Sequence, residues 1–155
     1  MEPKLFINGS WRDAQRGGKL DVIDPATERV FQQCAAGGAE DIDAAVAAAK
    51  AAMQGPWRRT SGKDRAKFLR AIAAAIEERK HALAEIEVKD NGKPLPEALW
   101  DIGDAAYCFN LYAGYAEDLD ARQGEVVAVP DARFQSRVKY MPAGVAGLIV
   151  PWNYP

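Results

Sequence analysis

Hydrophobic and polar positions in the first 36 residues form short runs that are separated by turn signals. The apolar run Leu5-Phe6-Ile7 ends at Asn8-Gly9, a residue pair that favours tight hairpin turns. Two further runs, 20–23 and 29–35, lie on either side of Asp24-Pro25, which cannot continue a strand ladder. The pattern predicts a small antiparallel β layer.

From Ala39 the apolar positions change to helical spacing. The pattern predicts helices at 39–54, at about 61–90 with a continuation or restart near residue 83, and at 97–122. Ser61 and Asp64 are plausible N-terminal caps of the second helix. The predicted buried positions are Ile42, Ala45, Val46 and Ala49 in the first helix, Phe68, Leu69, Ile72 and Ile76 in the second, and Leu99, Ile102, Ala106, Phe109, Ala113 and Ala116 in the third.

The last 30 residues return to strand patterns. Alternating runs at 125–129 and 134–140 predict a β-hairpin or extended arm. Val145–Val150 is continuously apolar, which is typical of a strand buried on both faces. Open α/β sheets bind ligands where such strands end. No partner strand or covering helix follows in the sequence, so we expect the front part of a longer α/β protein.

Composition narrows the functional classes. Lys and Arg total 20 against 22 Asp and Glu, so the net charge of −2 provides no basic footprint for nucleic acid. No apolar run is long enough to span a membrane, so we expect no membrane partner. The start of the chain lacks the apolar region of a secretory signal, which favours a cytoplasmic protein. Cys34 and Cys108 are expected to be small buried hydrophobic residues, and a single histidine argues against zinc.

Four motifs together resemble the N-terminal portion of the NAD(P)-dependent aldehyde dehydrogenase superfamily. They are Phe6-Ile7-Asn8-Gly9-Ser10-Trp11, Ile23-Asp24-Pro25-Ala26-Thr27, Asp90-Asn91-Gly92-Lys93-Pro94 and the segment 142–155. Segments 97–104 and 112–123 are most similar to the betaine-aldehyde and aminoaldehyde dehydrogenases. The resemblance implies an α/β fold. It assigns residues 1–123 to a β layer and helices that pack on the cofactor domain, 124–142 to the hairpin arm of an oligomerisation domain, and 143–155 to the first strand and catalytic turn of an incomplete NAD-binding domain.

The resemblance implies oxidation of a small-molecule aldehyde to an acid, through cysteine attack and hydride transfer to NAD, with NADP as the alternative. Asn153 would donate its amide to the oxyanion without carrying charge. By the residues alone, Asn153 is more simply a turn residue. Ile149, Val150, Pro151 and Trp152 would line the cofactor, although plain core packing also explains such a strand.

The resemblance also assigns substrate and cation contacts. Tyr154, Trp100, Asp101, Asp104 and Glu97 would surround a cationic aldehyde, because aromatic faces and carboxylates attract ammonium groups. Glu97, Asp101 and Asp104 share one helix face, which is otherwise explained as a solvated face. Gly103 departs from the subgroup, where a further acid is common.

The Ile23 carbonyl and Asp90 match a monovalent-cation site of the family, although Asp90 at a helix end is equally explained as a turn residue. The family's ribose lysine, nucleotide glycine turn, glutamate base and cysteine nucleophile have no counterpart here. The chain alone is therefore expected to be inactive. The alternatives are a non-catalytic oligomerisation module that pairs through 125–140, and a semialdehyde dehydrogenase. The family implies a homodimer or homotetramer.

Overall fold

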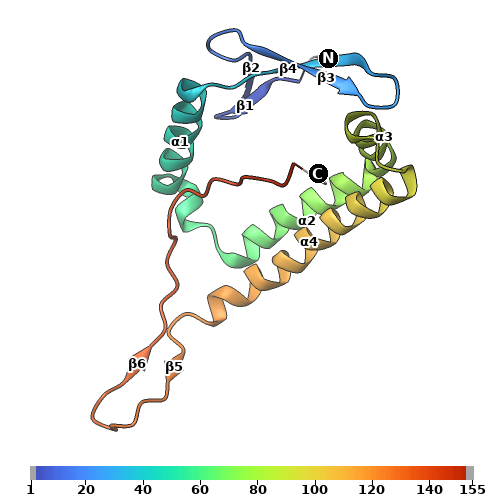
Figure 1. Ribbon diagram of the computed structural model, residues 1–155. Helices are drawn as coiled ribbons and strands as arrows, with labels where there is room; N and C mark the ends of the chain where they lie inside the picture. The colour runs from blue at the N-terminus through green and yellow to red at the C-terminus, as the bar shows by residue number, and fades with distance from the viewer. Residues whose placement is uncertain (1–2, 153–155) are drawn as a thin grey trace. The chain divides into compact units, whose positions relative to one another are not determined.

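A computed structural model describes residues 3–152 of the chain (Figure 1). The chain divides into two compact units. The first unit comprises the chain up to Arg58, His81–Leu99 and the segment from Gly144 onward. The second unit comprises Arg59–Lys80 and Trp100–Ala143.

Two antiparallel hairpins open the first unit, which confirms the predicted β layer. Strand β1 (Leu5–Ile7) pairs with β2 (Ser10–Arg12) across a turn in which Asn8 has φ 53° and Gly9 has φ 76°. Positive φ at both central residues matches the twist of hairpin strands, and Asn-Gly is the pair that adopts it at least cost. Strand β3 (Lys19–Asp24) pairs with β4 (Arg29–Ala35), with a register shift between Val22 and Ile23.

Helix α1 (Ala39–Gln54) follows, as predicted, and its start is fixed by a buried carboxylate. Asp41 is only 5% exposed and accepts hydrogen bonds from the amides of Gly38, at 3.0 Å, and Gln15, at 3.2 Å. These contacts satisfy one free amide at the helix start and one in the turn between β2 and β3. The spacing of apolar positions gave no indication that this acid is buried.

The predicted second helix is two helices. Helix α2 (Gly62–Glu78) starts at Ser61, whose Oγ accepts a hydrogen bond of 3.1 Å from the Asp64 amide. A short 3-10 turn, η1 (Pro56–Arg59), precedes α2. Helix α3 (Lys80–Asn91) begins directly after Arg79, the C-terminal cap of α2. Helix α4 (Leu95–Ala121) is the longest helix among the described residues and confirms the third predicted helix.

Alanine rather than large aliphatic side chains occupies the buried helix positions. In the second unit, α2 buries Ala66 and Ala73, and α4 buries Ala106 and Ala113. Figure 1 shows α2 and α4 side by side, and small residues allow such close approach. Close approach of the backbones turns larger neighbours outward. The prediction for α2 was therefore wrong for Phe68, which is 55% exposed, and for Ile72, which is 43% exposed. The prediction for α1 was wrong for Ile42, which is 62% exposed, and for Ala45, which is also exposed.

The predicted hairpin arm is present but short. Strand β5 (Val126–Val127) pairs with β6 (Ser136–Arg137), and hydrogen bonds between residues 124–125 and Val138 extend the ladder. At its base, the Arg122 guanidinium lies 5.2 Å from the centre of the Tyr140 ring and donates to its hydroxyl at 2.8 Å.

The prediction of a buried strand at Val145–Val150 was wrong for this structure. Residues 143–152 form no strand, and Ile149 is 100% exposed. A strand requires a neighbour to accept its backbone hydrogen bonds, and the described residues supply none beside this segment. The prediction that Cys108 is buried was also wrong, because its side chain is exposed.

Candidate functional site

The acidic face of α4 contains one well-defined side-chain pair. Trp100 Nε1 donates a hydrogen bond of 3.0 Å to Asp104 Oδ2, and Trp100 is 71% exposed. Asp101 is half-buried, whereas Glu97 and Asp104 are exposed. Helix α4 therefore carries four of the five predicted substrate residues, and the exposed ring of Trp100 lies beside the Asp104 carboxylate.

The Lys80 side chain lies against Gly103, the position at which the subgroup often has an acid. A Cβ atom at Gly103 would lie 2.6 Å from Lys80 Nζ, so the ammonium group fills the space that a side chain would take. The Lys80 ammonium is also 4.0 Å from a Glu77 carboxylate oxygen. The charge beside this helix position is therefore positive, from Lys80, and not negative. The sequence pattern did not predict this contact.

The four residues predicted to line the cofactor do not enclose a cavity. Val150 is 73% and Trp152 is 89% exposed, and Pro151 is exposed as well. Together with the fully exposed Ile149, these side chains face solvent, so this part of the chain alone forms no dinucleotide cradle. Asn153 and Tyr154, the predicted oxyanion donor and tunnel residue, lie outside the described residues.

The elements that carry the predicted cation ligands meet within the first unit. Ile23 is near the end of β3 and Asp90 is near the end of α3. Gly92 has φ 77°, and a Cβ atom there would lie 2.9 Å from Pro25 Cγ, so the two turns are in close contact. No group of three or more His, Cys, Asp or Glu side chains suited to a metal occurs within residues 3–152.

Lys93, in the motif 90–94, forms a buried ion pair with Glu87 that was not predicted. Lys93 Nζ is 2.6 Å from Glu87 Oε1, with side-chain exposures of 3% and 15%. Asn91 Oδ1 accepts a hydrogen bond of 2.8 Å from the Lys93 amide. The pair links the end of α3 to the turn before α4. The spacing of six residues across a helix end carries no recognised sequence signal.

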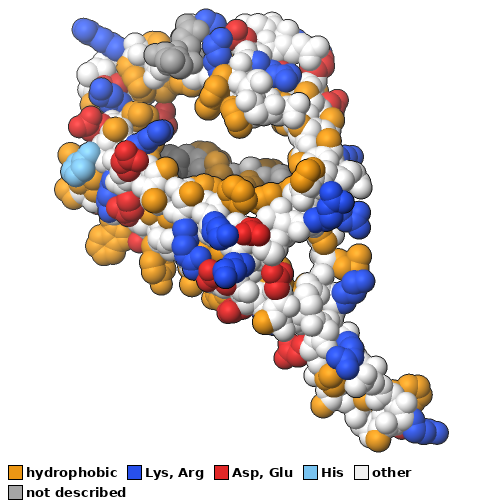
Figure 2. All heavy atoms as spheres, turned by 180° about the vertical axis from the view of Figure 1, so that it is seen from behind, with side chains coloured by type: hydrophobic (Ala, Val, Ile, Leu, Met, Phe, Trp, Pro, Cys, Tyr) orange, Lys and Arg blue, Asp and Glu red, His pale blue; other side chains and the backbone are white. Residues whose placement is uncertain are grey.

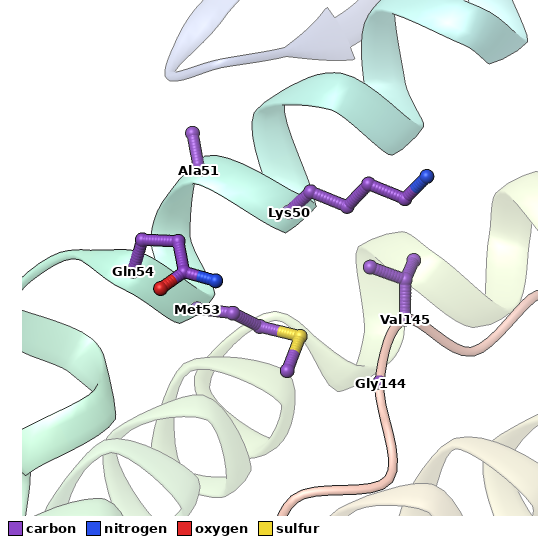
Figure 3. Close-up of a pocket in the computed structure, with 6 residues that line it drawn as sticks. All are labelled: Lys50, Ala51, Met53, Gln54, Gly144 and Val145. Atoms are coloured by element: carbon purple, nitrogen blue, oxygen red, sulfur yellow. The ribbon is translucent and has the colours of Figure 1, made fainter.

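One hollow in the first unit is lined by the end of α1 and by Gly144 and Val145 (Figure 3). Its volume is about 470 Å³, and its α1 residues are Lys50, Ala51, Met53 and Gln54. The lining offers one ammonium and one amide and lacks an acid–base pair or nucleophile. None of the predicted site residues contributes to it.

Ion pairs set the local electrostatics of the second unit. Hydrogen bonds of 2.6 and 2.8 Å from Arg70 lower the pKa of the Glu117 carboxyl and raise the pKa of the guanidinium. The side chain of Arg133 lowers the pKa of Asp131 in the arm. Charged side chains are visible over one face of the molecule in Figure 2. These pairs stabilise structure and lie outside the predicted site.

Comparison with known proteins decides the family. The sequence profile described as "Aldehyde dehydrogenase family" matches residues 11–155. The chain belongs to the aldehyde dehydrogenase family. The match covers the acidic face of α4 and the segment with Asn153, so the assignment from the four motifs is confirmed.

Relatives in this family carry the names suggested by segments 97–104 and 112–123. The chain is 46% identical to chloroplastic betaine aldehyde dehydrogenase of Beta vulgaris and 49% identical to peroxisomal aminoaldehyde dehydrogenase 2 of Pisum sativum. Each alignment covers 98% of this chain and 31% of the relative. The chain thus spans about a third of the length of the curated relatives it matches.

Solved structures of the family match the fold. Betaine aldehyde dehydrogenase from Staphylococcus aureus in complex with NAD+ matches with a TM-score of 0.78 and 31% identity, over 88% of this chain and 26% of that one. PnpE from Pseudomonas sp. WBC-3 matches with a TM-score of 0.87 and 36% identity, over 100% of this chain and 31% of that one. The α/β aldehyde dehydrogenase fold is therefore confirmed for this part.

The named relatives do not determine the cellular compartment of this protein. The two plant proteins are named for the chloroplast and the peroxisome, so a cytoplasmic location stays a prediction. Among residues 3–152, no helix combines the length and apolar character that crossing a membrane requires.

Proposed function

We propose that the whole protein oxidises a cationic aldehyde, betaine aldehyde or an ω-aminoaldehyde, to its carboxylic acid with NAD as hydride acceptor. The exposed Trp100 ring beside the Asp104 carboxylate is the observation that carries this substrate class. Aromatic faces bind alkylammonium groups, and nearby carboxylates raise their local concentration. The names of the plant relatives support the same class.

NAD is supported by the NAD+ complex of the S. aureus relative, and NADP remains the alternative. Residues 149–152 are exposed and form no cradle in this chain, so they do not build the cofactor site alone. In the whole protein, Ile149, Val150, Pro151 and Trp152 are proposed to contribute one wall of that site.

Asn153 is proposed to stabilise the oxyanion that forms when a thiolate adds to the aldehyde carbon. An amide N–H aimed at the developing negative charge stabilises the transition state more than the uncharged carbonyl. The asparagine carries no charge and therefore does not titrate over the working pH range. Tyr154 is proposed to line the path of the aldehyde.

The test is NADH formation by the purified whole protein, with betaine aldehyde, 4-aminobutanal and propanal as substrates. We expect kcat/KM to be highest for the two cationic aldehydes. Asn153→Ala should lower kcat by ~100- to 1000-fold. Asn110→Ala, an exposed amide on α4, is the matched control and should retain wild-type activity. Equal activity toward propanal would contradict the substrate class.

The 155-residue chain alone is proposed to be inactive. Neither of its cysteines lies in a motif that resembles the family's nucleophile. Incubation of the chain with NAD and betaine aldehyde should give no NADH. NADH formation by the chain itself would contradict this.

A second function, as an oligomerisation module, is favoured by the arm. Val126 and Phe134 on β5 and its connecting loop are 54% and 68% exposed, which leaves apolar surface available for pairing. We propose that the whole protein is a homodimer or homotetramer that uses 125–140. Light scattering after size exclusion distinguishes a discrete oligomer from a monomer.

The carboxylates on α4 disfavour a semialdehyde that carries its own carboxylate, because like charges repel.

The Ile23 carbonyl and Asp90 are proposed as ligands of a monovalent cation. The close contact of Pro25 with Gly92 brings their elements together. Hard oxygen ligands suit sodium or potassium. Thermal unfolding in sodium, potassium and tetramethylammonium chloride at one ionic strength tests this, with Asp90→Asn expected to remove any difference.

A further inference from the structure

Trp100 and Asp104 are held together by the geometry of α4. Side chains of a helix lean toward its N-terminus, so the carboxylate of Asp104 leans back over the turn that carries Trp100. The indole N–H donates to Asp104 Oδ2 at 3.0 Å. The acceptor is a carboxylate, which makes the hydrogen bond stronger than one between neutral groups.

We propose that Asp104 is a positioning residue, which holds the Trp100 indole so that the ring binds the alkylammonium end of the substrate. The inference rests on the proposed oxidation of cationic aldehydes and assigns different tasks to two neighbouring residues. Trp100 contacts the substrate. Asp104 acts mainly through Trp100.

The exposure of Trp100 explains why the ring needs such a partner. At 71% exposure, little of the indole is fixed by packing, and an unanchored side chain would lose rotamer freedom when it binds a ligand. The hydrogen bond to Asp104 restricts the ring before the substrate arrives. Preorganisation of this kind increases affinity because less ordering remains to be done on binding.

The direction of the hydrogen bond leaves the ring available. The indole N–H lies in the plane of the ring, so its carboxylate partner lies near the ring edge rather than over a face. A cation binds over the face, within about 6 Å of the ring centre. One face of Trp100 can therefore accept an alkylammonium group while Asp104 keeps its contact with Nε1.

Other charges near the pair do not replace this arrangement. Asp101 is half-buried and lies about 100° around the helix from Trp100. The Lys80 ammonium lies against Gly103, on the other side of Trp100. Asp104 is therefore the charged group that contacts the indole N–H of Trp100.

Three variants separate positioning from charge. Asp104→Asn keeps an oxygen acceptor and loses the charge, whereas Asp104→Leu loses both at similar size. Asp118→Asn is the matched control, because Asp118 is exposed and lies 14 residues beyond Asp104, which is about four turns along the same face of α4.

The first readout is the indole 15N–1H signal of Trp100 in the 155-residue chain, assigned with Trp100→Phe. Asp104→Leu should shift this signal and speed exchange of the indole proton about fivefold, the equivalent of one lost hydrogen bond. Asp104→Asn should have a smaller effect, and Asp118→Asn none. An unchanged Trp100 signal in Asp104→Leu overturns the proposal, whether or not the protein oxidises any aldehyde.

The second readout is KM in the whole protein. Asp104→Leu should raise KM for betaine aldehyde ~3- to 10-fold with kcat nearly constant, and should leave propanal unaffected. Asp104→Asn should stay closer to wild type than to Asp104→Leu. Equal KM increases in both variants would show that Asp104 acts on the substrate through its charge, and would overturn the positioning role. Absence of aldehyde oxidation by the wild-type protein would instead refute the proposed function, and the indole signal would still decide the positioning role.

Discussion

Gly62, the first residue of α2, lies directly against the backbone of Ala116 in α4. A Cβ atom at Gly62 would overlap the Ala116 carbonyl oxygen and lie 3.2 Å from its carbonyl carbon. The Gly62 amide donates a hydrogen bond of 2.7 Å to Asp120 Oδ2. The absence of a side chain thus lets the start of one helix contact the end of another, where an acid satisfies a free helix-start amide.

Gly62→Ala should destabilise the second unit by about 1–3 kcal/mol, because the methyl group meets rigid backbone. Gly103→Ala is the control. Its methyl group would meet only the end of the flexible Lys80 side chain, and alanine gains about 1 kcal/mol of helix propensity over glycine. Urea unfolding followed by circular dichroism should show a lower midpoint for Gly62→Ala and no loss for Gly103→Ala. Equal midpoints would contradict the backbone contact.

Removal of one partner from the buried Lys93–Glu87 pair should destabilise the first unit strongly. With Lys93 only 3% exposed, Glu87 would remain as a poorly solvated charge in Lys93→Met, at a cost of about 3–5 kcal/mol. The exposed pair Lys4–Asp13 is the control, and Lys4→Met should cost less than about 1 kcal/mol. Urea unfolding midpoints of the two single variants compare the loss at the buried pair with the loss at the exposed pair. The midpoint of the double variant Lys93→Met/Glu87→Leu shows the effect of removing both buried charges. The double variant should recover part of the loss. A single Lys93 variant as stable as wild type would refute the role of this pair.

Asp41→Ala should loosen the contact between the 15–18 turn and α1. The variant loses the acceptor for the Gln15 and Gly38 amides, which corresponds to about 1–2 kcal/mol for a capping contact. Hydrogen exchange should accelerate at those two amides. Asp43→Ala removes an exposed acid from the same helix and should leave both exchange rates unchanged. Full protection in Asp41→Ala would rule out the capping role.

The Arg70–Glu117 pair should stabilise the second unit in a pH-dependent way. Hydrogen bonds from Arg70 lower the pKa of Glu117 below its ordinary value of 4.5. A lowered pKa means that the stabilisation is fully present above pH 4.5 and is lost as the pH falls through the lowered value. In Arg70→Gln, carboxyl 13C titration should give a higher pKa for Glu117 than in wild type. Arg59→Gln, which removes an exposed guanidinium, should leave it unchanged.

The apolar segment near Ile149 should promote self-association of the 155-residue chain. Leu148 is 87% and Ile149 is 100% exposed, and contiguous exposed apolar surface favours aggregation. Ile149→Lys/Val150→Ser should shift sedimentation toward the monomer. Ile42→Lys removes an isolated exposed apolar residue of α1 and should have little effect. Unchanged association in the double variant would exclude this segment as the cause.

Local sequence signals determined most of the secondary structure. Asn8-Gly9 specified the first hairpin because few other pairs accept positive φ at both positions. Ser61 fixed the start of α2, and the apolar period located α1 and α4 within two residues. The four motifs also determined the family. These features depend on neighbours within a few residues, so they can be recognised without knowledge of the fold.

Tertiary structure alone decided which side chains are buried and which polar groups meet. Lys93 and Glu87 pair across a helix end, and the Lys80 ammonium fills the space over Gly103. The run Val145–Val150 shows the same limit, because its composition suits a buried strand but burial requires partner strands. The helical spacing of apolar positions predicted a single helix that carries both Trp100 and Asp104. The hydrogen bond between them was decided only by the folded helix, because rotamers, unlike helical period, depend on the three-dimensional surroundings.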